Sequence, residues 1–223
     1  MRGTMVAAGL GLFAVYLLTL CPTVYVEGSG ELIGAAYLLG TAHPTGYPLF
    51  CLLARLLAVA LPGQGPAWVV NLGTAVTAAA AGAALAGLLR ARGAGTPAAL
   101  SGALLMGWGR TVWSQAVVAE VYGLAALLLV LTMWAGLAAA PLAPGRRHAL
   151  TGYTMGLGLT AHLSQALLWP GLLAVMFGPR GRRRWRGLLL TALGALAGYS
   201  LVLYLPLRNL RGPGFHWGDL GAA

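Results

Sequence analysis

The chain has 223 residues, of which 59% are hydrophobic and only 8% are charged. Because soluble domains carry about 25% charged residues, this composition excludes a soluble globular protein and predicts an all-α integral membrane protein, formed as one domain over 1–223. All 14 basic residues are arginines in short loops between apolar runs, so the net charge of +10 is attributed to membrane topology and nucleic-acid binding is not expected.

About seven apolar runs are expected to cross a membrane, because a spanning helix needs ~20 mostly apolar residues. The first, 5–20, follows Arg2 and is interpreted as an uncleaved helix, since further apolar runs follow it. The others lie within 69–206: 69–89, 97–112, 119–139, two short helices within 149–178, and 187–206.

Residues 21–68 form a long first loop that is too apolar to be a plain connector. Segments 30–40 and 49–61 are predicted to be helices that lie flat at the membrane interface. Pro44 and Pro48 would break the chain between them.

The arginines predict the orientation, because cytoplasmic loops are enriched in basic residues. If Arg2 is inside, the clusters at 90–92, 146–147 and 180–186 are also inside, provided that 149–178 crosses twice. The outer face then receives the loop 21–68, residues 113–118, the turn at His162 and the tail 207–223. Four arginines fall outside: Arg55, Arg110, Arg208 and Arg211.

The four acidic residues all fall on this outer face. A carboxylate near the centre of a lipid-embedded helix costs roughly 2.5–3.5 kcal/mol, so a chain with so few acids is expected to keep them for a function. They are Glu27, Glu31, Glu120 and Asp219.

The first loop holds the densest group of polar side chains. Glu27 and Glu31 precede a rigid turn that contains His43 and Tyr47. A carboxylate here could accept a proton from a hydroxyl group or hold a cation. The alternative is a solvated loop in which Glu31 only caps a helix.

Three other polar residues each have a structural alternative. Glu120 could simply favour the positive end of the helix that it begins. His162 could be an ordinary hydrogen-bonding group in a turn. Arg208 suits a phosphate at headgroup level, with Arg110 as a weaker candidate, but either could be an interfacial arginine.

Together the motifs resemble, in order, those of the bacterial membrane proteins of the domain of unknown function 2723 family, which is related to the eukaryotic transmembrane protein O-mannosyltransferase. The resemblance covers about 20–220. The segments are Gly30-Glu31-Leu32, Ala42-His43-Pro44-Thr45-Gly46-Tyr47-Pro48-Leu49, Val70-Asn71-Leu72, Trp113-Ser114-Gln115, Glu120-Val121-Tyr122, Gly156-Leu157-Gly158 with His162, and Tyr204-Leu205-Pro206-Leu207-Arg208 with Trp217-Gly218-Asp219.

The resemblance implies a GT-C type glycosyltransferase in a bacterial inner membrane, with its active face outward. Such enzymes move a sugar from a polyprenyl-phosphate carrier to an acceptor hydroxyl, here of an unidentified protein or glycan. By similarity, Glu31 matches the acid of the family's Asp-Ser-Gly-Glu pattern. Gly28 replaces the Asp of that pattern, so Glu27 competes with Glu31 for the role of base.

The expected reaction is inverting, with Glu31 or Glu27 as the base. No cofactor or metal site is assigned, although a divalent metal is compatible with the pattern. The alternative is an inactive or truncated module that binds a lipid phosphate, which Gly28 and the end at Ala223 favour. The residues expected to bind substrate or donor are His43, Tyr47, Glu120, His162, Arg208 and Asp219.

Overall fold

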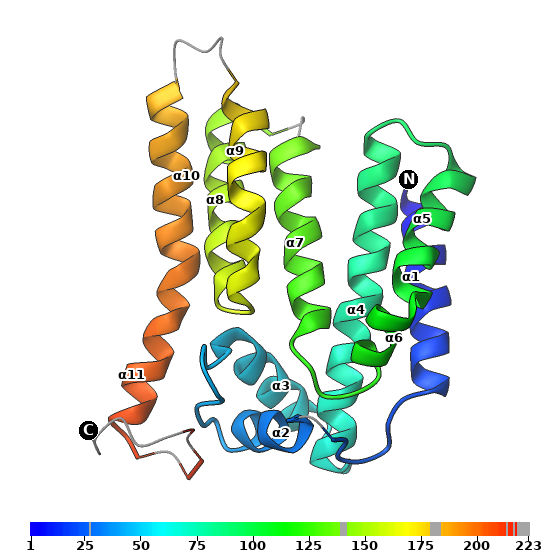
Figure 1. The fold of residues 1–223 in the computed structure, drawn as a ribbon, viewed down its shortest axis with the longest axis vertical. Coiled ribbons are helices and arrows are strands. Elements are labelled where there is room, and N and C mark those ends of the chain that lie inside the picture. The colour runs from blue at the N-terminus through cyan, green and yellow to red at the C-terminus, as the bar shows by residue number, and fades with distance from the viewer. Residues whose placement is uncertain (27, 139–141, 179–183, 213, 216, 218–223) are drawn as a thin grey trace.

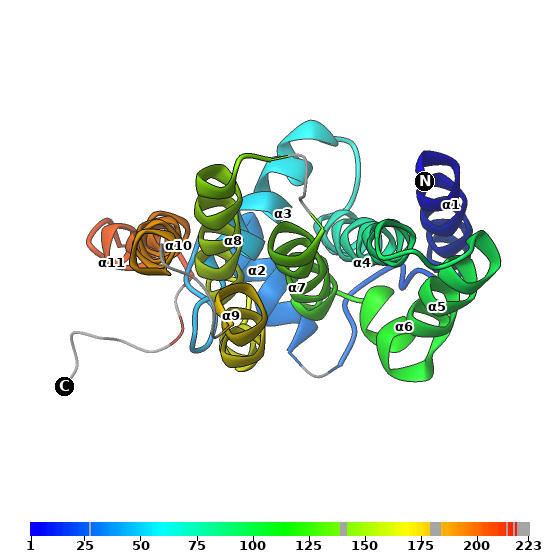
Figure 2. The same cartoon turned by 90° about the horizontal axis from the view of Figure 1, so that it is seen from above.

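The computed structural model describes residues 1–26, 28–138, 142–178, 184–212, 214–215 and 217. Its elements are helices, most of which run alternately up and down in an elongated bundle (Figure 1). Viewed from above, the long helices follow one another in an irregular row from α1 to α10 (Figure 2).

The N-terminal side of the bundle is formed by helices that approach closely. Helix α1 (Arg2–Leu18) packs on α4 (Pro66–Ala91) and on α5 (Thr96–Trp108), which a kink at Gly109 separates from the short α6 (Arg110–Ala116). The buried Tyr16 hydroxyl donates to the Gly107 carbonyl at 2.7 Å. The expected span 97–112 is therefore two helices.

The other side contains α7 (Tyr122–Leu137), α8 (Pro144–Leu159), η1 (Leu163–Leu168), α9 (Trp169–Phe177) and α10 (Arg184–Tyr199). The break that the sequence predicts within 149–178 is present, because α8 ends before a turn at His162. Helix α10 continues through η2 (Ser200–Leu203) into α11 (Tyr204–Asn209) at the lower end of Figure 1.

Glycines bring α8 and α10 together. Gly152 and Gly156 on α8 face the backbone of α10, and Gly194 and Gly198 on α10 face the backbone of α8. Each pair has the small-xxx-small spacing that allows membrane helices to approach closely. A Cβ added at Gly156 would lie 1.9 Å from the Ala195 carbonyl oxygen. The two backbones are therefore in direct contact.

Two short helices lie across the lower end of the bundle. They are α2 (Ser29–Tyr37) and α3 (Pro48–Ala60), and both pack against α4 (Figure 1). Helices are therefore present where the sequence predicts them, near 30–40 and 49–61. Their placement at a membrane interface stays a prediction.

Within the part of the chain that the structure describes, two helices are long and apolar enough to cross a membrane: Pro66–Ala91 and Trp185–Asn209. Only 11% of the most apolar stretch of Trp185–Asn209 is buried in the protein, although leucines dominate its surface. Such a surface is expected to face lipid rather than water. These helices support membrane association, whereas the total of about seven spans stays a prediction.

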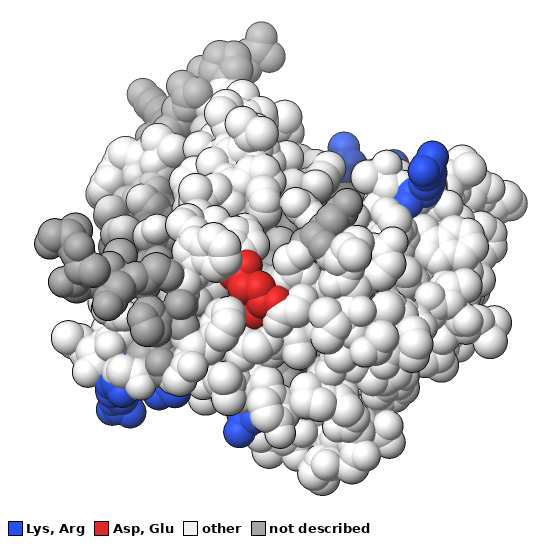
Figure 3. Space-filling model, turned by 60° about the horizontal axis from the view of Figure 1, so that its bottom comes forward, with Lys and Arg blue, Asp and Glu red and all other residues white. Residues whose placement is uncertain are grey.

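The two ends of the bundle differ in charge. Arginines stand at the end of α4 and near the starts of α8 and α10, and these helix ends lie at the upper end of Figure 1. The opposite end contains α2, α3 and α11, and Figure 3 shows acidic side chains gathered near its centre, with arginines towards the margin. The described acidic residues are Glu31 and Glu120.

Asn71 of α4 fastens the start of the first loop to the bundle. Its side chain is fully buried and donates to the carbonyls of Cys21 at 2.7 Å and Thr23 at 3.0 Å. Asn71→Leu is expected to lower the free energy of unfolding by about 1–2 kcal/mol, since it leaves two carbonyls without their donor. Thermal unfolding in detergent checks this, and an unchanged midpoint would contradict it.

Candidate functional site

A carboxylate and an imidazole are paired at the lower end of the bundle. Glu31 lies in the first turn of α2, and His43 lies in the loop before α3. The His43 backbone N–H donates to Glu31 Oε1 at 2.6 Å, and His43 Nδ1 lies 3.1 Å from Oε1 and 3.0 Å from Oε2. The exposed fractions of the two side chains are 37% for His43 and 15% for Glu31.

The pairing assigns the tautomer of His43. An ionised carboxylate only accepts hydrogen bonds, so Nδ1 carries the proton and Nε2 of the neutral ring is an acceptor. Nε2 lies 3.1 Å from the Tyr47 hydroxyl. In this tautomer the hydroxyl donates to Nε2. Glu31 thus orients His43, and the more exposed imidazole presents its basic nitrogen to the site.

A tight turn places Tyr47 beside His43. Gly46 has φ +82°, and Tyr47 itself adopts φ 43° at the start of α3. A Cβ at Gly46 would lie 2.7 Å from the side chain of Leu205 in α11. The turn therefore requires glycine both for its backbone conformation and for the contact with α11.

Gly46→Ala is expected to lower the free energy of unfolding by about 1–2 kcal/mol, because the Cβ of alanine clashes with the backbone in the left-handed conformation. The methyl group would also push against Leu205. Thermal unfolding measures the effect. Gly63→Ala is the matched control, since a Cβ there meets nothing within 4 Å; equal midpoints for the two variants would contradict the prediction.

Tyr47 connects the pair to residues that are distant in the sequence. Its ring lies nearly parallel to that of His162, with the ring centroids 6.3 Å apart. The ring centroids of Tyr122 and His162 are 5.5 Å apart. Burial raises the pKa of Tyr47, and Tyr122, Glu120 and Glu31 raise it further by charge repulsion. Five predicted site residues are thereby brought together: Glu31, His43, Tyr47, Glu120 and His162.

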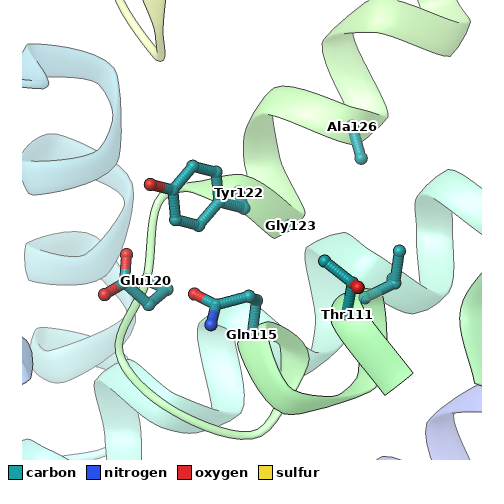
Figure 4. Close-up of a pocket in the computed structure, with 7 residues that line it drawn as sticks. Thr111, Gln115, Glu120, Tyr122, Gly123 and Ala126 are labelled. Atoms are coloured by element: carbon teal, nitrogen blue, oxygen red, sulfur yellow. The ribbon is translucent and has the colours of Figure 1, made fainter. Parts of the chain in front are cut away.

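Glu120 lies in the bend before α7, which begins two residues later at Tyr122. The prediction that Glu120 begins this helix is therefore corrected. The Thr74 hydroxyl of α4 lies 3.3 Å from the Glu120 carbonyl oxygen and 3.4 Å from the Glu120 backbone nitrogen. The Glu120 side chain borders a pocket of about 470 Å³, where Figure 4 shows it beside Gln115 and Tyr122.

His162 also makes the ordinary hydrogen bonds that its structural alternative requires. Its Nδ1 lies 2.8 Å from the Ser164 hydroxyl and accepts from the Ser164 backbone N–H at 3.2 Å. These bonds cap η1 and fix the ring. His162 therefore combines a turn-stabilising role with its place beside Tyr47.

Arg208 lies in α11, and its guanidinium is bonded to the end of α2. Nε donates to the Leu39 carbonyl and Nη2 to the Leu38 carbonyl, the latter at 3.2 Å. Nearby, the Tyr204 hydroxyl donates to the Gly40 carbonyl at 3.2 Å. These bonds give Arg208 a structural role that the sequence did not reveal.

The C-terminal tail adds an aromatic residue to the site. The Thr41 N–H donates to the Phe215 carbonyl at 3.2 Å, and the Trp217 N–H donates to the Thr41 carbonyl at 2.9 Å. The Trp217 ring lies 6.0 Å from that of His43. Trp217, Tyr122 and Gln115 belong to the motifs of the resemblance, but sequence reasoning did not assign them to the site.

Two predicted site residues, Glu27 and Asp219, lie outside the described residues. Among the residues that the structure describes, no three His, Cys, Asp or Glu side chains form a group that could hold a metal ion. The described residues provide a carboxylate–imidazole pair, Glu31 and His43, with Tyr47 and Glu120 as neighbours.

The chain matches known proteins over this same region. The family model for the N-terminal domain of protein O-mannosyl-transferase TMEM260 matches residues 28–184. Protein O-mannosyl-transferase TMEM260 of Mus musculus is 34% identical over 163 residues, covering 71% of this chain and 23% of the mouse protein. No solved structure shows a significant match.

The match therefore spans about a quarter of the curated relative. The match to the family model, over 28–184, includes Glu31, His43 and Glu120 but does not reach Arg208. The predicted relation to an O-mannosyltransferase is confirmed, whereas the domain of unknown function 2723 stays an expectation. The chain belongs to the family of the N-terminal domain of protein O-mannosyl-transferase TMEM260.

Proposed function

We propose that this protein is a membrane glycosyltransferase that moves a sugar from a polyprenyl-phosphate donor to an acceptor hydroxyl. The observation that carries the proposal is the Glu31–His43 pair, with Nδ1 of the imidazole 3.0 Å from the carboxylate. A carboxylate that orients a histidine is a recurring way to make its other nitrogen a general base. Membership of the O-mannosyltransferase family supports the reaction class.

In the proposed reaction, the acceptor oxygen attacks the anomeric carbon of the donor from the side opposite the phosphate. A bond forms between this oxygen and the anomeric carbon, and the bond from that carbon to the phosphate oxygen breaks. The electron pair leaves with the prenyl phosphate. The acceptor proton passes to His43 Nε2, while Glu31 stabilises the imidazolium that results.

The neighbouring groups then have separate tasks. Tyr47 already donates to His43 Nε2, so its hydroxyl occupies the place that the acceptor hydroxyl would take. Glu120 borders the adjacent pocket, where its carboxylate can accept hydrogen bonds from sugar hydroxyls. The roles of Glu27 and Asp219, and any divalent metal, remain predictions from the sequence.

We further infer that the site faces the outer side of a bacterial inner membrane. The helix ends that carry arginines, at the end of α4 and the starts of α8 and α10, lie at the opposite end of the bundle, as expected for the cytoplasmic side (Figure 1). The partners would then be the bilayer, the lipid-linked sugar and an acceptor protein or glycan at that surface.

The test is sugar release by the purified protein in liposomes. Donors would be a prenyl-phosphate-linked mannose and, as the control, a nucleotide-linked mannose, with water or an added hydroxyl compound as the acceptor. We expect the protein to consume the prenyl-phosphate-linked mannose and to leave the nucleotide-linked mannose unchanged. Binding of this donor without turnover would instead support an inactive lipid-phosphate module, the alternative that Gly28 favours.

A further inference from the structure

A second pocket adjoins the one in Figure 4. It has a volume of about 850 Å³ and lies between the end of α1, the loop that follows, α5 and α6. Gln115 and Glu120 line both pockets, so these side chains form the boundary between them. The larger pocket therefore adjoins the candidate site at Glu120.

The larger pocket carries a positive and a negative side chain at different places. Among the described residues that line it, Arg110 and Glu120 are the charged ones. Arg110 is exposed, whereas Glu120 is half-buried. The pocket thus offers a cation at its open side and a carboxylate where it meets the second pocket.

An apolar surface leads away from the Arg110 end. A neighbouring groove of about 420 Å³ follows one face of α5, lined by Ser101, Leu104, Leu105, Trp108 and Gly109. Trp108 also lines the larger pocket, so the groove and the pocket adjoin. Leu105 is 76% exposed, which suits contact with a hydrocarbon chain.

We propose that Arg110 binds the phosphate of a prenyl-phosphate ligand whose chain lies along the α5 groove and whose sugar lies against Gln115 and Glu120. The assignment rests on the proposed function and names the site at which its donor binds. The apolar groove, the Arg110 guanidinium and the Glu120 carboxylate follow one another along the surface. This order matches the hydrocarbon chain, the phosphate and the sugar hydroxyls of the ligand.

Arg110 suits this role better than Arg208. The Arg208 guanidinium already donates to the carbonyls of Leu38 and Leu39 at the end of α2. Engaging a phosphate would compete with those bonds and loosen α11 from α2. Arg110 instead borders a pocket that is large enough to admit a phosphate, and arginine can bind two phosphate oxygens at once.

The experiment compares equilibrium binding of farnesyl phosphate and farnesol to the purified protein in detergent. Farnesol has the same chain but no charge, so the ratio of the two affinities isolates the phosphate. Arg110→Gln is expected to weaken farnesyl phosphate binding about tenfold or more, the loss of a charge-assisted contact. Unchanged farnesol binding would show that the variant is folded.

Two arginine variants at the same end of the bundle serve as comparisons. Arg211→Gln, at an exposed position, is expected to bind farnesyl phosphate as the wild type does. A phosphate preference that survives in Arg110→Gln, or that is lost in Arg208→Gln instead, would overturn the Arg110 assignment alone. A wild-type protein with no preference for farnesyl phosphate over farnesol would overturn the prenyl-phosphate donor as well.

Discussion

Glu31→Gln is expected to slow sugar transfer about 100- to 10,000-fold, the range that general base catalysis contributes. Glutamine keeps an oxygen that can accept from the His43 backbone N–H, so the loop should stay in place. It removes the negative charge that would stabilise the His43 imidazolium as the acceptor proton arrives. The measurement is the turnover rate of a prenyl-phosphate-linked sugar in liposomes.

The partner residue provides the internal check on this prediction. Because Glu31 and His43 act through one pair of hydrogen bonds, His43→Gln should cost a similar factor. The double variant should lose little more than either single variant, as for other residues that act as a unit. If the Glu31→Gln variant turned over normally and Glu27→Gln did not, the Glu31–His43 pair would be contradicted. Glu27 would then be the base.

Gly156→Ala is expected to lower the free energy of unfolding by about 3 kcal/mol or more, the upper part of the range for overpacked interiors. The added methyl would lie 1.9 Å from the Ala195 carbonyl oxygen, and neither backbone can move without separating α8 from α10. Alanine is otherwise the better helix former by about 1 kcal/mol, so a loss must come from packing. Thermal unfolding in detergent measures it.

The matched control is Gly171→Ala in α9, where an added Cβ meets nothing within 4 Å. This variant should keep or slightly raise the unfolding midpoint. Transfer should also fall in Gly156→Ala, because α10 continues into α11, whose Leu205 supports the Gly46 turn. A Gly156→Ala protein as stable as the wild type would contradict the close backbone contact.

Much of the helical arrangement could be predicted from hydropathy and charge. The division of 149–178 followed from the need to keep Arg146 and the run at 180–186 on one face. The helices within 21–68 followed from apolar runs broken by proline and glycine. Such patterns are local, and they survive folding because each helix buries or exposes its own apolar surface.

The contacts of the site were predictable in part. Glu31, His43 and Tyr47 are close in the sequence, and a rigid turn makes their contact plausible. The ring of His162 reaches Tyr47 only because the turn between α8 and η1 lies over the first loop. Motif resemblance placed His162 in the same family pattern, but spacing alone could not show this contact.

Two contacts at the site depend on tertiary packing that the sequence does not show. Arg208 has the sequence context of a phosphate ligand, yet the end of α2 supplies carbonyls that bind its guanidinium. Trp217 joins His43 because Thr41 pairs with the tail through two backbone hydrogen bonds. Neither partner is near in the sequence, so hydropathy, charge and local spacing hold no signal for these contacts.

The most direct test of the proposed reaction is the configuration of its product. A β-linked prenyl-phosphate sugar, labelled with carbon-13 at the anomeric carbon, would be supplied to the protein in liposomes, and the first product would be followed by NMR. A single displacement assisted by the Glu31–His43 pair predicts an α-configured product. A β-configured first product, or no product from an intact, donor-binding protein, would contradict it.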